Sequence, residues 1–342
     1  ATLEVSDADA TSSSTATVTA QSGSNQPQTV ELSGTIESDS TLTAEKDYLV
    51  TGELSVSEGA TLTIEPGVHL PFEAGAGLYV NSNSVLDADG TSGEPITMTA
   101  TEGNEQAGWW QGVFSFSAEP NNLLNHVEVR HAGSGSPNSV DDGAVVIAGG
   151  SALTVTNSTI AQSGADGLLL NEANSTLDGF SDNTFSGNAD APVNIPFTNI
   201  GVIDSGSSFP DGKTVRVWGT TLEGDRDVTV NALSGDTPYR FTDGTSSIGE
   251  ATGGSSTVTI NPGVEMTFAS GTGLHVNNGS VLSADGTAAT ETTDGPITMT
   301  ATEGNGQQGW WNGVFVFSDN ANNLLNHVEV RHAGGDSPNS VD

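Results

Sequence analysis

The sequence contains no cysteine among its 342 residues. Disulfide bonds and thiolate metal sites are therefore excluded, and the fold must be held by side-chain packing and backbone hydrogen bonds. Long hydrophobic segments are missing too, because no run approaches the roughly 18 consecutive apolar residues of a membrane-spanning helix. We accordingly expect no insertion into a membrane.

Basic residues are scarce. Lys and Arg total 7 against 43 Asp and Glu, which gives a net charge of -36 at pH 7. Nucleic acids and anionic membranes are poor partners for this chain, because it has no basic stripe to neutralise phosphates. Self-repulsion on this scale destabilises a compact state unless counter-ions screen it, and at molar salt the Debye length falls to about 3 Å. The composition therefore predicts a halophilic protein from a saline habitat.

A segment of 39 residues occurs twice in the chain. Residues 95–133 and 296–334 are identical at 32 of 39 aligned positions. The differences lie at positions 105, 107, 111, 115, 118, 119 and 120 of the first copy. Segments this similar share one fold, so the chain is a tandem array of structural repeats.

The repeat also predicts the domain boundaries. Residues 214–217 resemble residues 29–32 at the start of the array. A first unit therefore spans residues 29–213, and residues 214–342 form a second, incomplete copy. Residues 1–28 precede the array and are predicted to hold short extended strands and a linker.

Short apolar alternations, each closed by a turn with Gly or Asp, fill both copies. The strands predicted in the first copy include 69–72, 77–80, 85–88, 96–99, 112–116, 127–130, 144–147, 153–155, 158–160 and 167–170. No helical period interrupts them, which excludes α/β folds. A Greek-key sandwich and a parallel β-helix remain. Strands of 3 to 5 residues with few Asn-Gly dipeptides favour the parallel β-helix.

In a parallel β-helix, alternate side chains of each strand point into one continuous core. Val127 and Val129 are therefore predicted to point inward. In the strand 112–116 the same reasoning places Phe114 and Phe116 inside. Ser115 is then expected on the outer side, where its replacement by valine in the second copy would be tolerated.

Five motifs resemble right-handed parallel β-helix repeat proteins of the pectate-lyase-like superfamily, nearest to its large secreted or surface members from microbes of saline water. They are Leu62–Val68, Gly77–Val80, Pro95–Thr99, Gly108–Val113 and Val127–Gly133. The resemblance covers residues 29–342 and implies a right-handed β-solenoid. It implies no single function, because the superfamily includes polysaccharide lyases and hydrolases, tailspikes, adhesins and passive stalks.

The densest chemistry is the cluster of His126, Glu128 and Arg130. It recurs in the second copy as His327, Glu329 and Arg331. On one strand the three side chains would share the outer face at a spacing of about 6.6 Å, within reach of a glycan or a protein partner. The alternative is a structural role, an outward row of salt bridges with His131 hydrogen-bonded at a turn.

Paired tryptophans form a second candidate contact. Alternation permits one member of each pair to point inward, so Trp110 is expected in the core beside Phe114 and Trp109 at the surface. In the second copy Trp311 is expected inside and Trp310 outside. The two surface indoles are candidates for stacking on sugar rings or on a neighbouring subunit, or for a purely structural role.

Metal and modification signals are weak. Asp87 and Asp89 look like part of a calcium loop, but the full ligand spacing is missing, and a solvated turn is the alternative. We expect no cofactor, with calcium at these two residues as the one candidate. Asn157, Asn174 and Asn278 begin acceptor triplets for N-glycosylation, a pattern that chance also produces in a chain rich in Asn, Ser and Thr.

No complete catalytic constellation stands out, which favours a non-catalytic role while leaving enzymatic activity open. We expect an extracellular or cell-surface structural protein, a rigid acidic β-solenoid acting as a stalk, an adhesin-like spacer or a self-assembling filament subunit. Its copies would associate head to tail, with residues 1–28 adding strands to a neighbour's sheet edge. The alternative is a secreted carbohydrate-active protein, a polysaccharide lyase or hydrolase or a glycan-binding module, that contacts a surface or matrix polysaccharide.

Overall fold

The computed structural model describes residues 29–135, 141–210, 212–250, 254–287, 295–302 and 305–335. Their regular structure consists of β-strands and two short 3-10 helices, η1 (Phe197–Val202) and η2 (Ser234–Asp236). The chain divides into two compact units, Ala1–Asp190 (unit 1) and Ala191–Asp342 (unit 2). The strands predicted before residue 29 lie outside the described residues.

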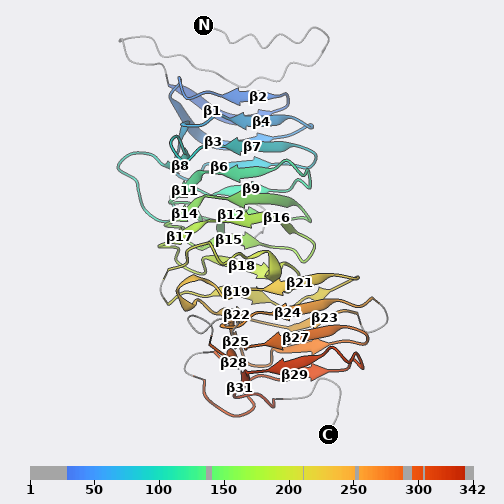
Figure 1. The fold of residues 1–342 in the computed structure, drawn as a ribbon. Helices are drawn as coiled ribbons and strands as arrows, with labels where there is room; N and C mark the ends of the chain where they lie inside the picture. The colour runs from blue at the N-terminus through green and yellow to red at the C-terminus, as the bar shows by residue number, and fades with distance from the viewer. Residues whose placement is uncertain are drawn as a thin grey trace. The chain divides into compact units, whose positions relative to one another are not determined.

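Unit 1 is built of coils whose short strands join three parallel sheets (Figure 1). Sheet A contains β5 (His69–Phe72), β8 (Ile96–Ala100), β11 (Val127–Arg130), β14 (Thr159–Ala161) and β17 (Thr184–Ser186). Sheet B contains β2 (Ser40–Leu42), β4 (Thr61–Ile64), β7 (Val85–Asp89), β10 (Leu123–Asn125), β13 (Ala152–Thr156) and β16 (Thr176–Ser181). Sheet C contains β6 (Gly77–Val80), β9 (Val113–Ser115), β12 (Gly143–Ile147) and β15 (Asp166–Leu170). Two longer strands, β1 (Val30–Ile36) and β3 (Tyr48–Val56), start in sheet A and end in sheet C.

The strand register aligns apolar side chains of successive coils into ladders. The ladder of sheet A consists of Leu70, Met98, Val129, Ile160 and Phe185. The ladder of sheet B consists of Leu42, Ile64, Ala88, Leu124, Val155 and Phe180. All these side chains are buried, so each coil covers the apolar face of the coil before it. The predicted inward direction of Val127 and Val129 is confirmed, since both are 0% exposed.

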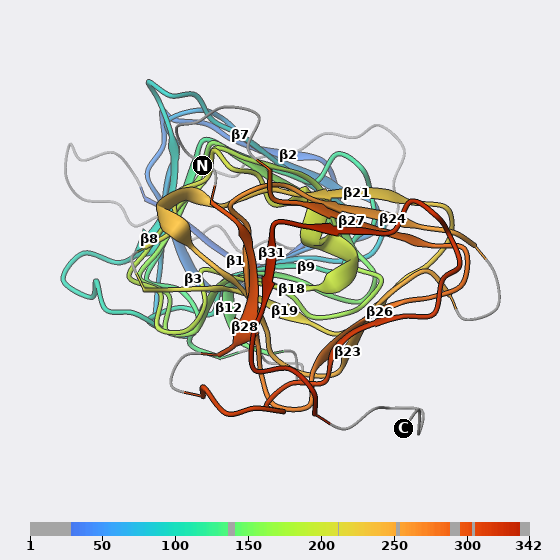
Figure 2. The same ribbon diagram turned by 60° about the horizontal axis from the view of Figure 1, so that its bottom comes forward.

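Unit 2 repeats this organisation in three sheets. Sheet A′ contains β18 (Val193–Pro196), β19 (Val215–Trp218), β22 (Tyr239–Phe241), β25 (Glu265–Phe268), β28 (Ile297–Ala301) and β31 (Val328–Val330). Sheet B′ contains β21 (Asp227–Val230), β24 (Thr257–Ile260), β27 (Val281–Asp285) and β30 (Leu324–Asn326). Sheet C′ contains β20 (Thr221–Leu222), β23 (Thr245–Ile248), β26 (Gly273–Val276) and β29 (Gly313–Val316). In Figure 2, β21, β24 and β27 run along one side of the coil and β23 and β26 along another.

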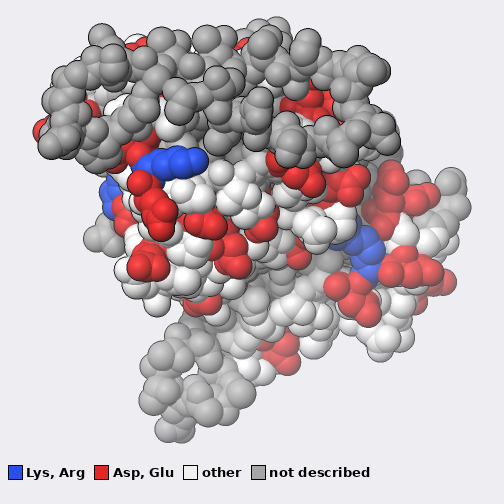
Figure 3. Space-filling model, turned by 90° about the horizontal axis from the view of Figure 1, so that it is seen from above, with Lys and Arg blue, Asp and Glu red and all other residues white. Residues whose placement is uncertain are grey.

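The predicted fold, an all-β right-handed parallel β-helix, is confirmed in both units. The predicted domain division at residue 213 stays a prediction, because it marks where the sequence repeat restarts, whereas the division between residues 190 and 191 separates two sets of contacts. No helix among the described residues is long and apolar enough to cross a membrane. Figure 3 shows many carboxylate side chains and few basic ones on the described surface of one face.

The predicted orientation of Ser115 is wrong. Ser115 is 2% exposed and pairs in register with Val80 and Ile147, which both lie in the core. Phe114 therefore points to the opposite, outer side of sheet C. Period-two alternation shows which residues share a side, but it does not show which side faces the core, and here the serine occupies the inner one.

Candidate functional site

Sheet C carries a second hydrophobic cluster on its outer side. It consists of Tyr79, Phe114, Val146, Ala148 and Leu169, all buried, with Phe116 packed against it. The rings of Tyr79 and Phe114 stack with centroids 5.0 Å apart. Burial, reinforced by the charge of Glu53, raises the pKa of the Tyr79 phenol above its ordinary range, and its hydroxyl donates to Gln111 Oε1. The outer side of sheet C thus carries a packed apolar cluster with one hydrogen-bonded phenol.

The sequence does carry a signal for this cluster that the period-two analysis missed. Strands β6, β12 and β15 are buried at every position. Their sequences are unbroken apolar runs rather than alternations, such as Ala144–Ile147 and Leu168–Leu170. Such runs are typical of parallel strands that are covered on both faces.

The charged residues of the densest cluster pair with each other. Arg130 Nε donates to Glu128 Oε2 at 2.9 Å, and both side chains are 34% exposed. In the neighbouring coils Glu128 faces Thr97 and Thr159. The charges therefore form one pair within one strand, without the charged neighbours above and below that a ladder requires. Glu329 and Arg331 form the same pair in the second copy.

His126 does not share the strand face of Glu128 and Arg130, which corrects the predicted cluster. It forms the corner between β10 and β11, where its φ is 49°. His327 has a φ of 51° at the same corner of the second copy. Asn157 and Asp182 occupy this corner in the next two coils with φ of 50° and 55°. Asn, Asp and His tolerate this left-handed conformation better than most residues, so the histidine has a conformational role here.

His131 forms the following corner and is satisfied there, as predicted. It is 5% exposed, its φ is 63°, and its Nδ1 lies 2.9 Å from Thr99 Oγ1 in the preceding coil. His332 and Thr300 make the same contact at 3.0 Å. Burial lowers the pKa of the His131 imidazole, an effect that the nearby Arg130 charge increases. The side chain therefore links two coils in its neutral form.

The inner tryptophans lie in the core, as predicted. Trp110 and Trp311 are both 0% exposed. Trp110 stacks on Phe72 with centroids 3.9 Å apart, and Trp311 stacks on Phe268 at 4.1 Å. Their partners thus belong to the preceding coil, and the predicted neighbourhood of Trp110 and Phe114 is wrong.

The outer tryptophans are half-buried rather than surface platforms. The indole of Trp109 donates to the carbonyl oxygen of Phe72 at 3.1 Å, which anchors its polar edge to the coil. Trp310 is half-buried as well. Each side chain is thus partly covered, and contact with a glycan or a partner at these residues stays a prediction.

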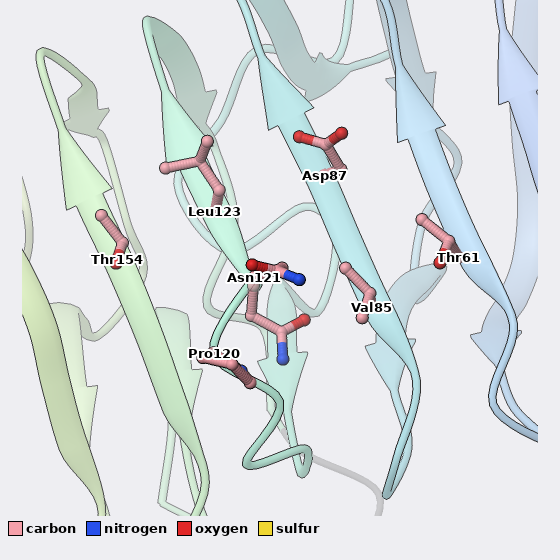
Figure 4. A pocket seen from close by; sticks show the side chains of 8 residues that line it. Thr61, Val85, Asp87, Pro120, Asn121, Leu123 and Thr154 are labelled. Atoms are coloured by element: carbon pink, nitrogen blue, oxygen red, sulfur yellow. The ribbon is translucent and has the colours of Figure 1, made fainter.

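A shallow groove of about 400 Å³ crosses the outer side of sheet B (Figure 4). Its lining residues are Thr61, Val85, Asp87, Pro120, Asn121, Asn122, Leu123 and Thr154. Asp87, Leu123 and Thr154 come from adjacent strands and lie in register with each other. Burial raises the pKa of the Asp87 carboxyl, and the charge of Asp89 adds to the effect. The groove thus combines one carboxylate with hydroxyl, amide and apolar side chains.

The proposed calcium pair at this groove remains a prediction. Asp89 accepts a hydrogen bond from Asn125 Nδ2 at 2.7 Å, and the second copy repeats this contact between Asp285 and Asn326 at 3.0 Å. Among the described residues, no group of three or more His, Cys, Asp and Glu side chains is placed to hold a metal ion. Asp87 and Asp89 alone would leave most of the coordination sphere of calcium to water.

The three acceptor asparagines, Asn157, Asn174 and Asn278, are all exposed. Asn157 also donates to Asn125 Oδ1 at 2.9 Å, so its amide already takes part in a corner contact. Glycosylation at these residues stays a prediction that exposure alone does not decide.

Stacked coils, three parallel sheets per unit and inward ladders make this chain a parallel β-helix repeat protein. Residues 34–142 match the family model described as a pectate-lyase-like β-helix domain. No curated protein and no solved structure matches the chain. The match supports the β-helix fold for residues 34–142, and the function has to be argued from the surface that this fold presents.

Proposed function

We propose that the chain is a non-catalytic structural protein of the cell exterior, in which a rigid, acidic β-solenoid serves as a stalk, an adhesin-like spacer or a filament subunit. The residues common to the two copies support this role. They include the ladder residues, the corner histidines and the buried tryptophans, so the repeat preserves a scaffold.

One observation carries the proposal. In each copy the charged side chains best suited to acid-base chemistry, Glu128 with Arg130 and Glu329 with Arg331, form an ion pair with each other. In each pair the carboxylate is already bound by the guanidinium of its own strand, so neither charged group is presented alone to a ligand. The pairs therefore support a structural use of this surface.

A panel of acidic and neutral polysaccharides, incubated with the purified protein with and without calcium, tests the proposal. We expect no new reducing ends and no unsaturated products. Products formed by the wild type but not by Glu128→Gln would contradict it and would place an active site at the ion pair.

The groove on sheet B favours a second candidate function, a glycan-binding module. The hydroxyl and amide groups of Thr61, Thr154 and Asn121 suit the hydroxyls of a sugar, and Val85 and Leu123 supply an apolar floor. The surrounding negative charge favours a neutral glycan over an acidic one.

Retention on immobilised neutral polysaccharides tests this second function. Binding by the wild type that Leu123→Asp weakens at least about tenfold would support a glycan site in the groove. The matched control is Leu324→Asp at the equivalent position of the second copy, where the groove residue Asp87 is replaced by Ser283. Equal retention of wild type and Leu123→Asp would exclude the groove.

A further inference from the structure

Asp87 is the acidic side chain among the residues that line the groove on sheet B. It lies on β7 between Thr63 of β4 and Leu123 of β10, its partners in register, and neither of them carries a charge. Within the part of the chain that the structure describes, Asp87 forms no ion pair and no hydrogen bond. The groove therefore contains a carboxylate without a counter-ion.

The surroundings of Asp87 disfavour its ionised form. The side chain is half-buried, and its burial raises the pKa of the carboxyl, with a further contribution from the charge of Asp89. A cation in the groove would offset both effects, because an opposite charge and a charge-assisted hydrogen bond favour the ionised carboxylate. The groove thus lacks the partner that its own carboxylate calls for.

The second copy shows that the strand itself does not need this carboxylate. β27 (Val281–Asp285) has the same sequence as β7 (Val85–Asp89) except that Ser283 stands in the place of Asp87. Ser283 pairs in register with Thr259, as Asp87 does with Thr63. The same strand and register therefore form with serine at this position, which leaves the Asp87 carboxylate available for a ligand.

One rim of the groove also differs between the copies. Residues 117–122 connect β9 and β10, and three of the seven differences between the long repeats lie at positions 118, 119 and 120. Pro120 lines the groove, and Ala321 takes its place in the second copy. The five other lining residues that have a counterpart there are identical. The first copy is therefore distinguished at the groove by its carboxylate and its rim.

The rest of the groove suits a sugar better than a single ammonium side chain. Val85 and Leu123 supply an apolar floor for the C–H face of a sugar ring, and Asn121 supplies an amide for its hydroxyls. Asp87 and Thr154 lie two strands apart, about 10 Å at the usual strand spacing (Figure 4). A lysine side chain bound at Asp87 would leave the opposite end unused, whereas a glycan of several rings spans both ends.

The charge of the whole chain favours the same kind of ligand. A net charge of -36 attracts cations towards the surface and repels anions. A glycan with carboxylate groups would be repelled, and a neutral glycan would leave Asp87 without a counter-ion. A glycan with free amino groups matches both the surrounding field and the carboxylate in the groove.

We propose that the groove on sheet B binds a glycan with free amino groups, and that Asp87 is its specificity-determining residue. The Asp87 carboxylate accepts a charge-assisted hydrogen bond from a protonated amine of one sugar ring, while Asn121 and Thr154 contact hydroxyls of the chain. The proposal rests on the glycan-binding function given above as the second candidate, and it names the class of sugar.

Isothermal titration calorimetry of the full chain with three tetrasaccharides tests the proposal. The probes are β-1,4-linked tetramers of glucosamine, N-acetylglucosamine and glucose, used at a mildly acidic pH at which the free amines are charged. Salt at about 1 M shortens the Debye length to about 3 Å and suppresses the general attraction of cations to the acidic surface. We expect one site per chain, with the glucosamine tetramer bound at least about tenfold more tightly than the other two.

Two substitutions remove the carboxylate and keep the groove. Asp87→Asn preserves its shape, and Asp87→Ser introduces the residue that the second copy has at this position, so both variants should fold. Each should weaken binding of the glucosamine tetramer at least about tenfold while the thermal unfolding profile stays cooperative. Asp243→Asn makes the same change of charge at an exposed position outside the groove and should bind as the wild type does.

Four results would overturn the proposal. Equal binding of the three tetramers, weakened by Leu123→Asp, would retain the glycan-binding function and exclude the role of Asp87. Absence of binding to all three would remove both. Equal losses in Asp87→Asn and Asp243→Asn would indicate general attraction to the acidic surface. Tetralysine bound as tightly as the glucosamine tetramer, with the same loss in Asp87→Asn, would make a lysine-rich peptide the ligand.

Discussion

The two copies of the repeat place the same residues in opposite environments. Leu124 is 0% exposed, and its equivalent Leu325 is 49% exposed. Val129 and Val330 differ in the same way, at 0% and 44%. The flanking sequence is identical from residue 121 to 133 and from 322 to 334. The difference comes from the coil that follows, since β13 and β14 cover the first pair of strands.

This contrast shows that burial in a solenoid is a property of neighbouring coils. Each coil is covered by the next one, so stability is approximately a sum of coil and interface contributions. Two segments of identical sequence therefore need not have the same local stability. The energetic effect of a substitution therefore depends on the coil that follows as well as on the coil that carries the residue.

The largest expected effect is a direct test of this contrast. Leu124→Asp places a carboxylate between Ala88 and Val155 with no partner, and should lower the free energy of unfolding by about 4 kcal/mol or more. Leu325→Asp makes the same change at a half-exposed position and should cost less than about 1 kcal/mol. Urea unfolding at low protein concentration measures both. Equal losses would mean that the second coil is covered as well as the first.

The inner tryptophans provide the counterpart to this contrast. Trp110 and Trp311 are buried in both copies, so the same substitution should have the same effect in each. Trp110→Ala and Trp311→Ala each remove a ring that stacks on a phenylalanine of the preceding coil. Each should cost about 3 to 5 kcal/mol. Thermal unfolding followed by circular dichroism compares the two. If Trp311→Ala lowered the free energy of unfolding by less than about 1 kcal/mol, as a substitution at an exposed residue does, unit 2 would be loosely packed around Trp311 and Phe268.

A moderate effect is expected from pH. Burial holds the pKa of His131 below its ordinary value, so below about pH 6.5 the unfolded chain binds a proton that the folded chain resists. Stability should therefore fall as the pH is lowered through this range. His131→Asn keeps a residue that tolerates positive φ and removes the titrating group. Urea unfolding at pH 5.5 and 7.5 checks this, and an equal decline in the wild type and His131→Asn would exclude the histidine as its cause.

The smallest effect is expected at the ion pairs, where the two copies should agree. Glu128→Gln and Glu329→Gln should each change the free energy of unfolding by less than about 1 kcal/mol, because both pairs are accessible to solvent and screened by salt, the first at 34% exposure and the second more exposed. Denaturant unfolding at low and high salt is the measurement. A larger loss for Glu128→Gln alone would reveal a function of the first pair that the second does not share.

Most of the fold follows from the sequence, because strand period and repeat are local patterns. The strands predicted at 69–72, 77–80 and 127–130 match β5, β6 and β11 in both bounds. The orientation of Ser115 does not follow, because alternation leaves two choices of side that the packing of Val80 and Ile147 decides.

The candidate site follows from the sequence less fully than the strands do. His126 looked like a strand residue because a single left-handed corner between two strands leaves no gap in the pattern. Residues 61 and 154 line one groove around Asp87, an arrangement that depends on the register of four strands. The exposure of Leu325 depends on the neighbouring coils. It therefore does not follow from the sequence around Leu325, which is the same as that around the buried Leu124.

Hydrogen exchange of the native protein, followed by mass spectrometry, tests the central claim most directly. Peptides 116–126 and 317–327 differ in mass because their sequences differ near the start, yet they contain the identical segment from Asn121 and Asn322 onward. Among the described residues β10 is paired on both sides and β30 on one, so we expect the first peptide to exchange at least about 100-fold more slowly at low protein concentration. Equal exchange in the two peptides would contradict the claim that the neighbouring coil determines the stability of each repeat.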